Sequence, residues 1–182
     1  MIALIDGVNF FVSCERVFRP DLEGKPVIVL SCNDGCAISR SNEVKRMGVP
    51  MGAPYFKVRH LLEEANTAVF SSNFQLYGDL SNRMMTLLEQ SAPRCETYSI
   101  DEAFLDFSGI LDPTEYARTL RSMILKSLGL PTSIGIAPTK TLAKIANRLS
   151  KKDPKYHHVC LLKDEDSIRD ALAQTRVDIF GG

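Results

Sequence analysis

The stretch YSIDEAFLDF, residues 98–107, decides how the chain is expected to fold, because it sets two adjacent acids between runs typical of strands. Asp101 and Glu102 separate CETYSI from AFLDF, and both runs carry the aromatic, β-branched and other apolar residues that strands favour. An acidic pair in such a place is most often a solvated turn. The alternative is a site where strands bring carboxylates together for chemistry.

A further acid follows the opening run IALID, residues 2–6, which predicts a strand that ends at Asp6 and is followed by Gly7. A single carboxylate at a strand end is unremarkable. If this strand lies beside the other two, however, three carboxylates meet at one sheet edge, and their mutual repulsion is costly without a cation. Oxygen ligands at this density suit Mg²⁺, which completes its coordination with water and substrate phosphates.

A basic helix is expected within APTKTLAKIANRLSKK, residues 137–152, with Thr139 as its N-cap. Lys140 and Lys144 lie one turn apart on the same face, and Arg148 with Lys151 or Lys152 continues that face. A basic face is usually just solvated. Because this helix follows the strand TSIGIA, the alternative is that it presents cations to phosphates near the acids.

The other elements follow from apolar periodicity and from Gly and Pro signals. Strands are expected at residues 27–31, 36–39, 67–72, 132–137 and 158–162, in addition to those named above. Helices are expected at residues 10–18, 41–48, 56–65, 73–90, 113–128 and 139–150, and from residue 165. Since strands and helices do not alternate strictly, the sequence predicts an α+β fold with a mixed, largely antiparallel sheet and helices on one face.

Composition limits the functional classes. The 182 residues contain 22 Lys and Arg and 22 Asp and Glu, so the net charge does not indicate a nucleic-acid or membrane partner. No apolar run approaches the roughly 18 residues of a membrane span, and no basic leader region precedes IALID. Five cysteines favour a reducing compartment, and the lone close pair Cys32 and Cys36 does not support zinc. We therefore expect a cytoplasmic protein.

Five stretches carry a resemblance to a known family. They are DGVNFFVSCE from Asp6, RPDLEGKPVIVLSCNDGCAISRSNEVKRMGVPMGAPYFK from Arg19, FSSNFQLYGDLSNRM from Phe70, YSIDEAFLD from Tyr98 and GIAPTKTLAKIANRLSKK from Gly135. In this order, the chain resembles the N-terminal part of the Y-family translesion DNA polymerases, specifically the UmuC branch, to which the catalytic subunit of bacterial DNA polymerase V belongs.

This resemblance implies a polymerase palm interrupted by a small fingers insertion. The palm is expected at residues 1–18 and 74–166, the fingers at 19–73, and the start of a connection to a thumb at 167–182. The family's thumb and little-finger domains are not expected in this chain, which would make it a fragment or a natural truncation.

The resemblance also implies roles for single residues. Asp6, Asp101 and Glu102 match the catalytic ligands of two Mg²⁺ ions, and the carbonyl of Gly7 matches one further oxygen ligand. Phe11 matches the steric gate, which excludes the 2′-hydroxyl of a ribonucleotide. Expected contacts to the incoming nucleotide are Ser39, Arg40, Asn42, Lys45 and Lys144, while Tyr98 and Ser99 are expected to support the acids. Asn9 carries less weight, because Gly7 departs from the family pattern just ahead of it.

The implied activity is template-directed DNA synthesis past damaged bases, as in DNA repair and SOS mutagenesis, by two-metal nucleotidyl transfer. Implied partners are primer-template DNA and deoxynucleoside triphosphates and, by resemblance alone, UmuD-type subunits, a recombinase filament and a sliding clamp. This chain by itself is expected to be weakly active or inactive. Two alternatives stay open: another palm-type two-metal enzyme such as a nucleotide cyclase, against which SIDEAF argues, and a non-catalytic homologue that binds DNA or protein.

Overall fold

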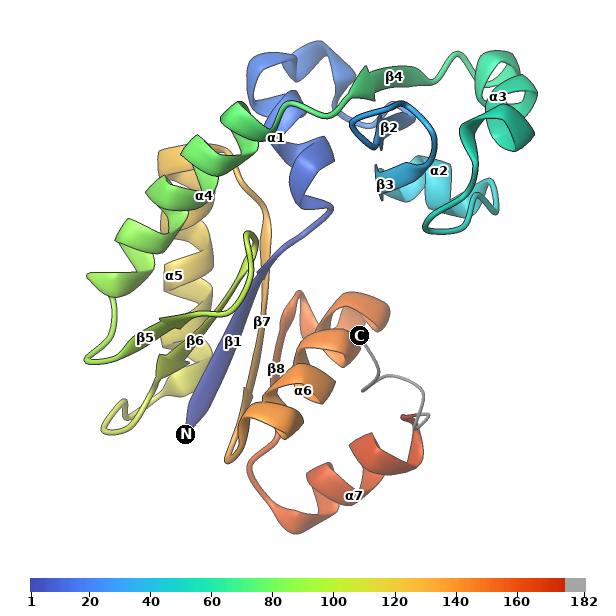
Figure 1. Cartoon of the computed structure of the whole chain (residues 1–182). Helices are drawn as coiled ribbons and strands as arrows, with labels where there is room; N and C mark the ends of the chain where they lie inside the picture. Colours follow the sequence, from blue (N-terminus) through green and yellow to red (C-terminus); the bar gives the residue numbers. More distant parts are fainter. Residues whose placement is uncertain (176–182) are drawn as a thin grey trace. The chain divides into compact units, whose positions relative to one another are not determined.

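The computed structural model describes residues 1–175, which divide into two compact units. The first unit contains Met1–Gly7 and the described residues from Ser81 onward, and the second unit is Val8–Leu80. The long helix α4 (Phe74–Glu89) passes from the second unit into the first. Figure 1 labels the elements of both units.

The first unit is built on a five-stranded sheet in the order β5-β6-β1-β7-β8 (Figure 1). Its further elements are β1 (Ile2–Gly7), β5 (Cys95–Thr97), β6 (Glu102–Asp106), α5 (Pro113–Leu128), β7 (Thr132–Ala137), α6 (Lys140–Lys152), a 3-10 turn (Pro154–Tyr156), β8 (Val159–Leu161) and α7 (Glu165–Ala173). The central strand β1 runs antiparallel to both β6 and β7, and only β8 pairs in parallel, with β7. The predicted α+β class and the mixed, largely antiparallel sheet are confirmed.

Helices cover both faces of this sheet, whereas the sequence predicted helices on one face. Every residue of β7 is buried, which requires a layer on each side of the strand. On one side α6 packs so closely that a Cβ on Gly135 would lie 2.1 Å from the backbone nitrogen of Asn147. On the other side α4 and α5 cover the sheet (Figure 1), and Ala117, Leu120 and Ile124 of α5 are buried.

The helix boundaries of the first unit follow from capping residues. The side chain of Asp112 accepts hydrogen bonds from the backbone N–H groups of Thr114 and Glu115, and Pro113 opens α5. Gly129 ends α5 in the left-handed conformation, at φ 71°. Thr139 caps α6 as predicted, through the backbone N–H of Leu142. The sequence signals therefore place these helix ends to within about two residues, the usual uncertainty of helix boundaries.

The second unit contains a three-stranded sheet in the order β3-β2-β4. Its elements are α1 (Phe10–Phe18), a 3-10 turn (Pro20–Leu22), β2 (Val27–Leu30), β3 (Ala37–Arg40), α2 (Asn42–Arg46), α3 (Tyr55–Glu64) and β4 (Ala68–Ser71). β2 pairs antiparallel with β3 and parallel with β4. A turn that contains Asp34, at φ 53°, joins β2 to β3.

Helix α1 belongs to the second unit, because it packs on β2 and β3. We expected residues 8–18 with the palm and a fingers boundary at residue 73, so the compact units divide the chain at different points from the expected domains. The assignment of palm and fingers stays a prediction. The expected connection at 167–182 begins within α7, and residues 176–182 lie outside the described residues.

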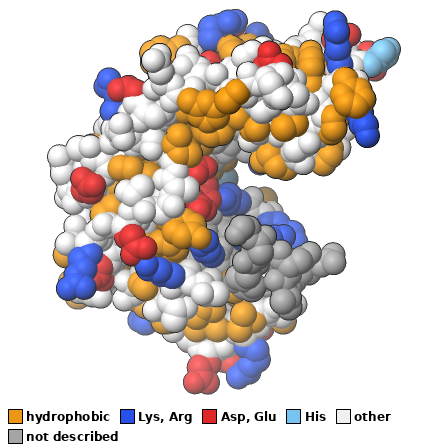
Figure 2. Space-filling model, in the orientation of Figure 1, with side chains coloured by type: hydrophobic (Ala, Val, Ile, Leu, Met, Phe, Trp, Pro, Cys, Tyr) orange, Lys and Arg blue, Asp and Glu red, His pale blue; other side chains and the backbone are white. Residues whose placement is uncertain are grey.

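The distribution of charge on the surface agrees with the equal numbers of acidic and basic residues in the sequence. Figure 2 shows acidic and basic side chains interspersed on the visible face. Within residues 1–175, no helix combines the length and the apolar character needed to cross a bilayer.

Candidate functional site

The first unit brings the three predicted acids together at one end of its sheet. The register of β1 and β6 sets Asp6 directly opposite Glu102, and residues opposite each other on neighbouring strands share one face. Asp101 lies just ahead of β6, and its carbonyl oxygen accepts a hydrogen bond from the N–H of Gly7 at 2.9 Å. Asp6 is only 8% exposed. The acids therefore lie close together where water screens them poorly.

A tight turn ahead of β6 places Asp101. The N–H groups of Tyr98 and Ser99 both donate to the carbonyl of Glu102, so β5 ends at Thr97, earlier than the predicted residue 100. The hydroxyl of Ser99 then donates to Oδ1 of Asp101 at 2.8 Å. Ser99 thus orients the carboxylate of Asp101.

The electrostatics of the site show an excess of negative charge. Burial, the charge of Asp6 and a hydrogen bond with Asp6 raise the pKa of Glu102 to about 7. Burial also raises the pKa of Asp101, against the hydrogen bond from Ser99, which lowers it. A bound cation would relieve both effects, because it stabilises the ionised carboxylates.

Lys151 of α6 is the cation nearest to the acids among the ion pairs of the described residues. Its Nζ lies 2.6 Å from Oδ2 of Asp6, and this pair is partly buried. The sequence pattern had left the choice between Lys151 and Lys152 open. Lys151 lies two helical turns after Lys144 on one face, whereas Arg148 is exposed.

Lys144, which was expected to contact nucleotide, lies near the acids without pairing with Asp6. Its Nζ is 4.0 Å from the centroid of the Tyr98 ring, which is a cation–π contact. Its charge is also one of the influences that lower the pKa of Glu102. The geometry therefore places Tyr98 as the support of Lys144, and the nucleotide role of Lys144 stays a prediction.

The donor set at this site suits a hard divalent cation, although the side chains are engaged with other partners. No group of three or more His, Cys, Asp or Glu side chains within residues 1–175 is arranged around one point as a metal site. Asp6 is paired with Lys151 and Asp101 with Ser99 instead. Three clustered carboxylates, two of them with raised pKa, nevertheless have the chemistry that Mg²⁺ requires.

The second unit gathers part of the expected nucleotide-binding set around Asn9. Oδ1 of Asn9 accepts a hydrogen bond from Nζ of Lys45 at 2.5 Å, and its Nδ2 donates to Oδ1 of Asn42 at 3.1 Å. Asn9 itself precedes α1 in the left-handed conformation, at φ 49°. Asn tolerates that conformation better than most residues do. An Asn just ahead of a helix was therefore a sequence signal for a special position, and we gave Asn9 too little weight.

Ser39 and Arg40 make other contacts. The hydroxyl of Ser39 accepts a hydrogen bond from the backbone N–H of Val12 at 3.4 Å, and Arg40 donates to the carbonyl of Val49. Burial lowers the pKa of Arg40. Since consecutive strand residues point to opposite faces, Ser39 and Arg40 do not act as one cluster, and their nucleotide roles stay predictions.

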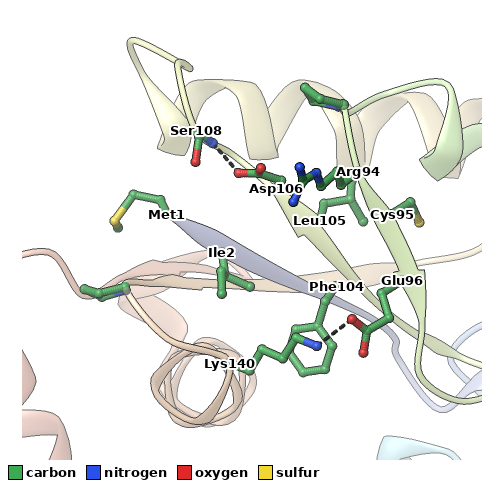
Figure 3. Close-up of a pocket in the computed structure, with 12 residues that line it drawn as sticks. Met1, Ile2, Arg94, Cys95, Glu96, Phe104, Leu105, Asp106, Ser108 and Lys140 are labelled. Carbon is green, nitrogen blue, oxygen red and sulfur yellow. Dashed lines mark hydrogen bonds and ion pairs between the residues drawn. The ribbon is translucent and has the colours of Figure 1, made fainter.

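A pocket of about 900 Å³ lies at the end of the first unit's sheet where β1 begins (Figure 3). Three of its charged side chains are already engaged: Nζ of Lys140 lies 2.5 Å from Oε2 of Glu96, and Asp106 accepts from the N–H of Ser108 at 2.8 Å. Figure 3 shows these groups pairing with one another along the pocket wall. The acidic site at the other end of β1 is therefore the better candidate for chemistry.

Comparison with known proteins agrees with this site. A family model described as the impB/mucB/samB family matches residues 5–148, most of the chain and all three acids. The chain belongs to this family.

The relatives of this chain include the protein UmuC of Salmonella typhimurium. The two are 52% identical over 155 residues, which cover 84% of this chain and 37% of that protein. The protein named DNA polymerase IV 2 of Mesorhizobium japonicum is 36% identical over 148 residues, 79% of this chain and 34% of that protein. The chain thus spans less than half the length of these relatives.

Solved structures confirm the fold of this impB/mucB/samB chain. DinB from Sulfolobus solfataricus superposes with a TM-score of 0.85 at 28% identity, over 100% of this chain and 54% of that chain. An insertion ternary complex of Dbh DNA polymerase superposes with a TM-score of 0.84 at 28% identity, over the same shares. The chain therefore has the fold of about half of a Y-family DNA polymerase.

Proposed function

We propose that this chain carries the nucleotidyl-transfer site of a translesion DNA polymerase that copies damaged templates in the SOS response. The observation that carries the proposal is the cluster of Asp6, Asp101 and Glu102 at one end of the sheet, in a chain of the impB/mucB/samB family. Relatives named as DNA polymerases support the reaction class. The same proposal includes binding of primer-template DNA and the use of deoxynucleoside triphosphates as substrates.

The acids would hold two divalent cations, with the carbonyl of Gly7 as a further ligand. When bound, such ions acidify the primer 3′-hydroxyl and neutralise the phosphates of the incoming nucleotide. The side chains prepare the site: Ser99 keeps Asp101 oriented, and Glu102, whose pKa is raised to about 7, remains partly protonated near neutral pH. Lys151 balances the charge of Asp6 and is in place to pair with a phosphate oxygen instead.

The second unit would recognise the nucleotide. Lys45 and Asn42 converge on Asn9, and they are the group of this unit that we assign to the triphosphate. Phe11 of α1 would exclude ribonucleotides by filling the space that a 2′-hydroxyl needs. Ser39 and Arg40 remain assigned to nucleotide contacts by resemblance, and Lys144 of the first unit does so on the same basis. UmuD-type subunits, a recombinase filament and a sliding clamp are proposed partners on the same basis.

The test is primer extension by the chain at enzyme excess, with Mg²⁺ or Mn²⁺, for the wild type and for Asp101→Asn. We expect slow incorporation by the wild type and a loss on the order of a thousandfold or more in the variant, because one ligand contributes several kcal/mol of transition-state stabilisation. Glu23→Gln, an exposed acid of the second unit, is the matched control.

Mn²⁺ binding, followed by water proton relaxation, supplies a readout that does not depend on turnover. Wild-type chain should bind Mn²⁺ more tightly than Asp101→Asn does. Equal Mn²⁺ affinity in both proteins, with no incorporation by either, would support the non-catalytic alternative in which the chain only binds DNA or protein.

A further inference from the structure

The second unit buries an acid that the proposed reaction does not use. Glu15 of α1 is 9% exposed, and its Oε1 accepts a hydrogen bond of 2.7 Å from the hydroxyl of Tyr77 of α4, a side chain with no exposed surface. Burying a carboxylate is unfavourable unless hydrogen bonds compensate for the lost water. The burial of Glu15 against Tyr77 therefore calls for a structural or functional explanation.

Tyr77 is also the platform of Phe11. Their ring centroids are 4.6 Å apart with an interplanar angle of 20°, which is a stacked pair. Phe74 packs its edge against both rings, with centroids at 5.8 Å from Phe11 and 5.9 Å from Tyr77. Phe11 is partly exposed, so one of its faces rests on a fully buried ring while part of its surface stays accessible.

The geometry links Glu15 to Phe11 twice. Phe11 and Glu15 lie four residues apart in α1 and so share one face of the helix, which is the face that meets Tyr77. The hydroxyl of Tyr77 lies on the long axis of its ring, so the bond to Glu15 sets the depth and tilt of the ring on which Phe11 stacks. Burial, together with the hydrogen bond to Glu15, raises the pKa of Tyr77, so the hydroxyl remains a donor throughout the physiological range.

We infer that Glu15 is a positioning residue for sugar selection: by holding the hydroxyl of Tyr77, it sets the position of the Phe11 ring. This inference rests on the proposed role of Phe11 as the residue that excludes ribonucleotides. Steric exclusion of one hydroxyl requires a ring that does not yield. The exchange Tyr77→Phe would keep the apolar stack and remove the hydrogen bond to Glu15.

Three single variants separate anchoring from charge. Tyr77→Phe removes the donor, Glu15→Leu removes the acceptor, and Glu15→Gln keeps an acceptor oxygen without the charge. We expect ribonucleotide incorporation relative to deoxyribonucleotide to rise by up to about tenfold in the first two variants, a factor equivalent to about 1.4 kcal/mol. The rise should appear as a lower ribonucleotide KM, and Glu15→Gln should stay close to the wild type.

The double variant Glu15→Leu/Tyr77→Phe tests whether selectivity merely follows stability. Each of its parent variants leaves a buried polar group unpaired, whereas the double variant removes both partners and should recover much of the lost thermal stability. We expect its sugar selectivity to remain relaxed. Recovery of selectivity together with stability would mean that the pair acts only on folding and would overturn the inference.

Tyr116→Phe is the matched control. The hydroxyl of Tyr116 donates to the carbonyl of Ser91, and its ring packs against Phe107 in the first unit, whereas the stack that holds Phe11 belongs to the second unit. Its sugar selectivity should equal that of the wild type. A rise in ribonucleotide incorporation as large as that of Tyr77→Phe would show a nonspecific effect and sink the inference.

Phe11→Ala distinguishes failure of this inference from failure of the proposed function. If Phe11→Ala relaxes sugar selection while Tyr77→Phe and Glu15→Leu keep the wild-type ratio, only the role of Glu15 is wrong. If Phe11→Ala leaves the ratio unchanged, the gate assignment fails. If primer extension is too slow to measure, sugar selectivity is measured instead as the ratio of the affinities for ATP and dATP in the presence of Mg²⁺. Absence of binding of either nucleotide would overturn both the inference and the proposed function.

Discussion

Glu102 combines partial burial with two acidic neighbours, and its pKa of about 7 records the cost of that arrangement. A carboxyl whose pKa is higher in the folded than in the unfolded chain binds more protons when folded between the two values. Its contribution to stability is thus fully present below about pH 4.5 and is lost as the pH rises through about 7. At neutral pH the clustered carboxylates therefore lower the stability of the metal-free protein.

We therefore predict that Glu102→Gln raises the melting temperature of the metal-free chain at pH 8 and reduces its change between pH 5 and pH 8. A gain of about 2–4 °C would follow from about 1 kcal/mol of relieved repulsion. Thermal melts in the presence of a chelator measure it, with Glu23→Gln as the exposed control. A lower melting temperature, or an unchanged pH slope, would contradict the electrostatic account.

At the scale of elements, the approach of α6 to β7 is what brings Lys151 to Asp6. Gly135 makes this possible, because a Cβ there would lie 2.1 Å from the nitrogen of Asn147 and 2.3 Å from the carbonyl of Ala143. Asn147 also reaches into the sheet, where its Nδ2 donates to the carbonyl of Ser133 at 3.0 Å. The helix is thus held against the strand by both shape and hydrogen bonds.

Gly135→Ala is predicted to destabilise the chain by about 3 kcal/mol or more, since backbone rather than a flexible side chain must move. Gly78→Ala in α4 is the matched control: its Cβ would meet nothing within 4 Å, and the exchange should stabilise the helix by about 0.5–1 kcal/mol. Urea unfolding of both variants measures the difference. Similar stabilities for the two would show that α6 can shift without cost.

At the scale of the whole molecule, the basic residues of α6 are largely committed inside the chain. Lys140 pairs with Glu96, Lys151 pairs with Asp6, and Lys144 rests over Tyr98. The net charge is zero, and acidic and basic side chains are interspersed on the visible face (Figure 2). Arg148 and Lys152 are the other basic residues of α6 and both are exposed, so this helix offers few unengaged cations to the phosphates of a DNA duplex.

We therefore expect this chain to bind primer-template DNA no more tightly than about 10⁻⁶ M at physiological salt, with a shallow dependence on salt concentration. A fluorescence anisotropy titration at several salt concentrations gives both values. Lys152→Ala removes an exposed cation of α6 and should reduce the slope slightly, whereas Lys126→Ala in α5 serves as the comparison. Submicromolar affinity with a steep salt slope would show that the chain holds DNA by contacts that this charge distribution does not predict.

Local sequence signals determined most of the secondary structure and the identity of the acids. Pro113 and Gly129 bound α5 because a proline suits the first turn of a helix and a glycine suits its left-handed end. Asp6, Asp101 and Glu102 stood out because each lies at the end of an apolar run, where strands are expected to expose polar groups. These features depend on neighbours in the sequence, which a single chain displays directly.

Only the tertiary structure decided how distant residues combine. It selected Lys151 for Asp6, placed helices on both faces of the sheet, gave Ser39 and Arg40 partners other than Asn9, and stacked Phe11 on Tyr77. The 3.6-residue period of a helix tells which residues share a face and leaves open what that face meets. That choice depends on the close approach of α6 at Gly135 and on the packing of α1 against α4, over separations at which sequence periodicity carries no information.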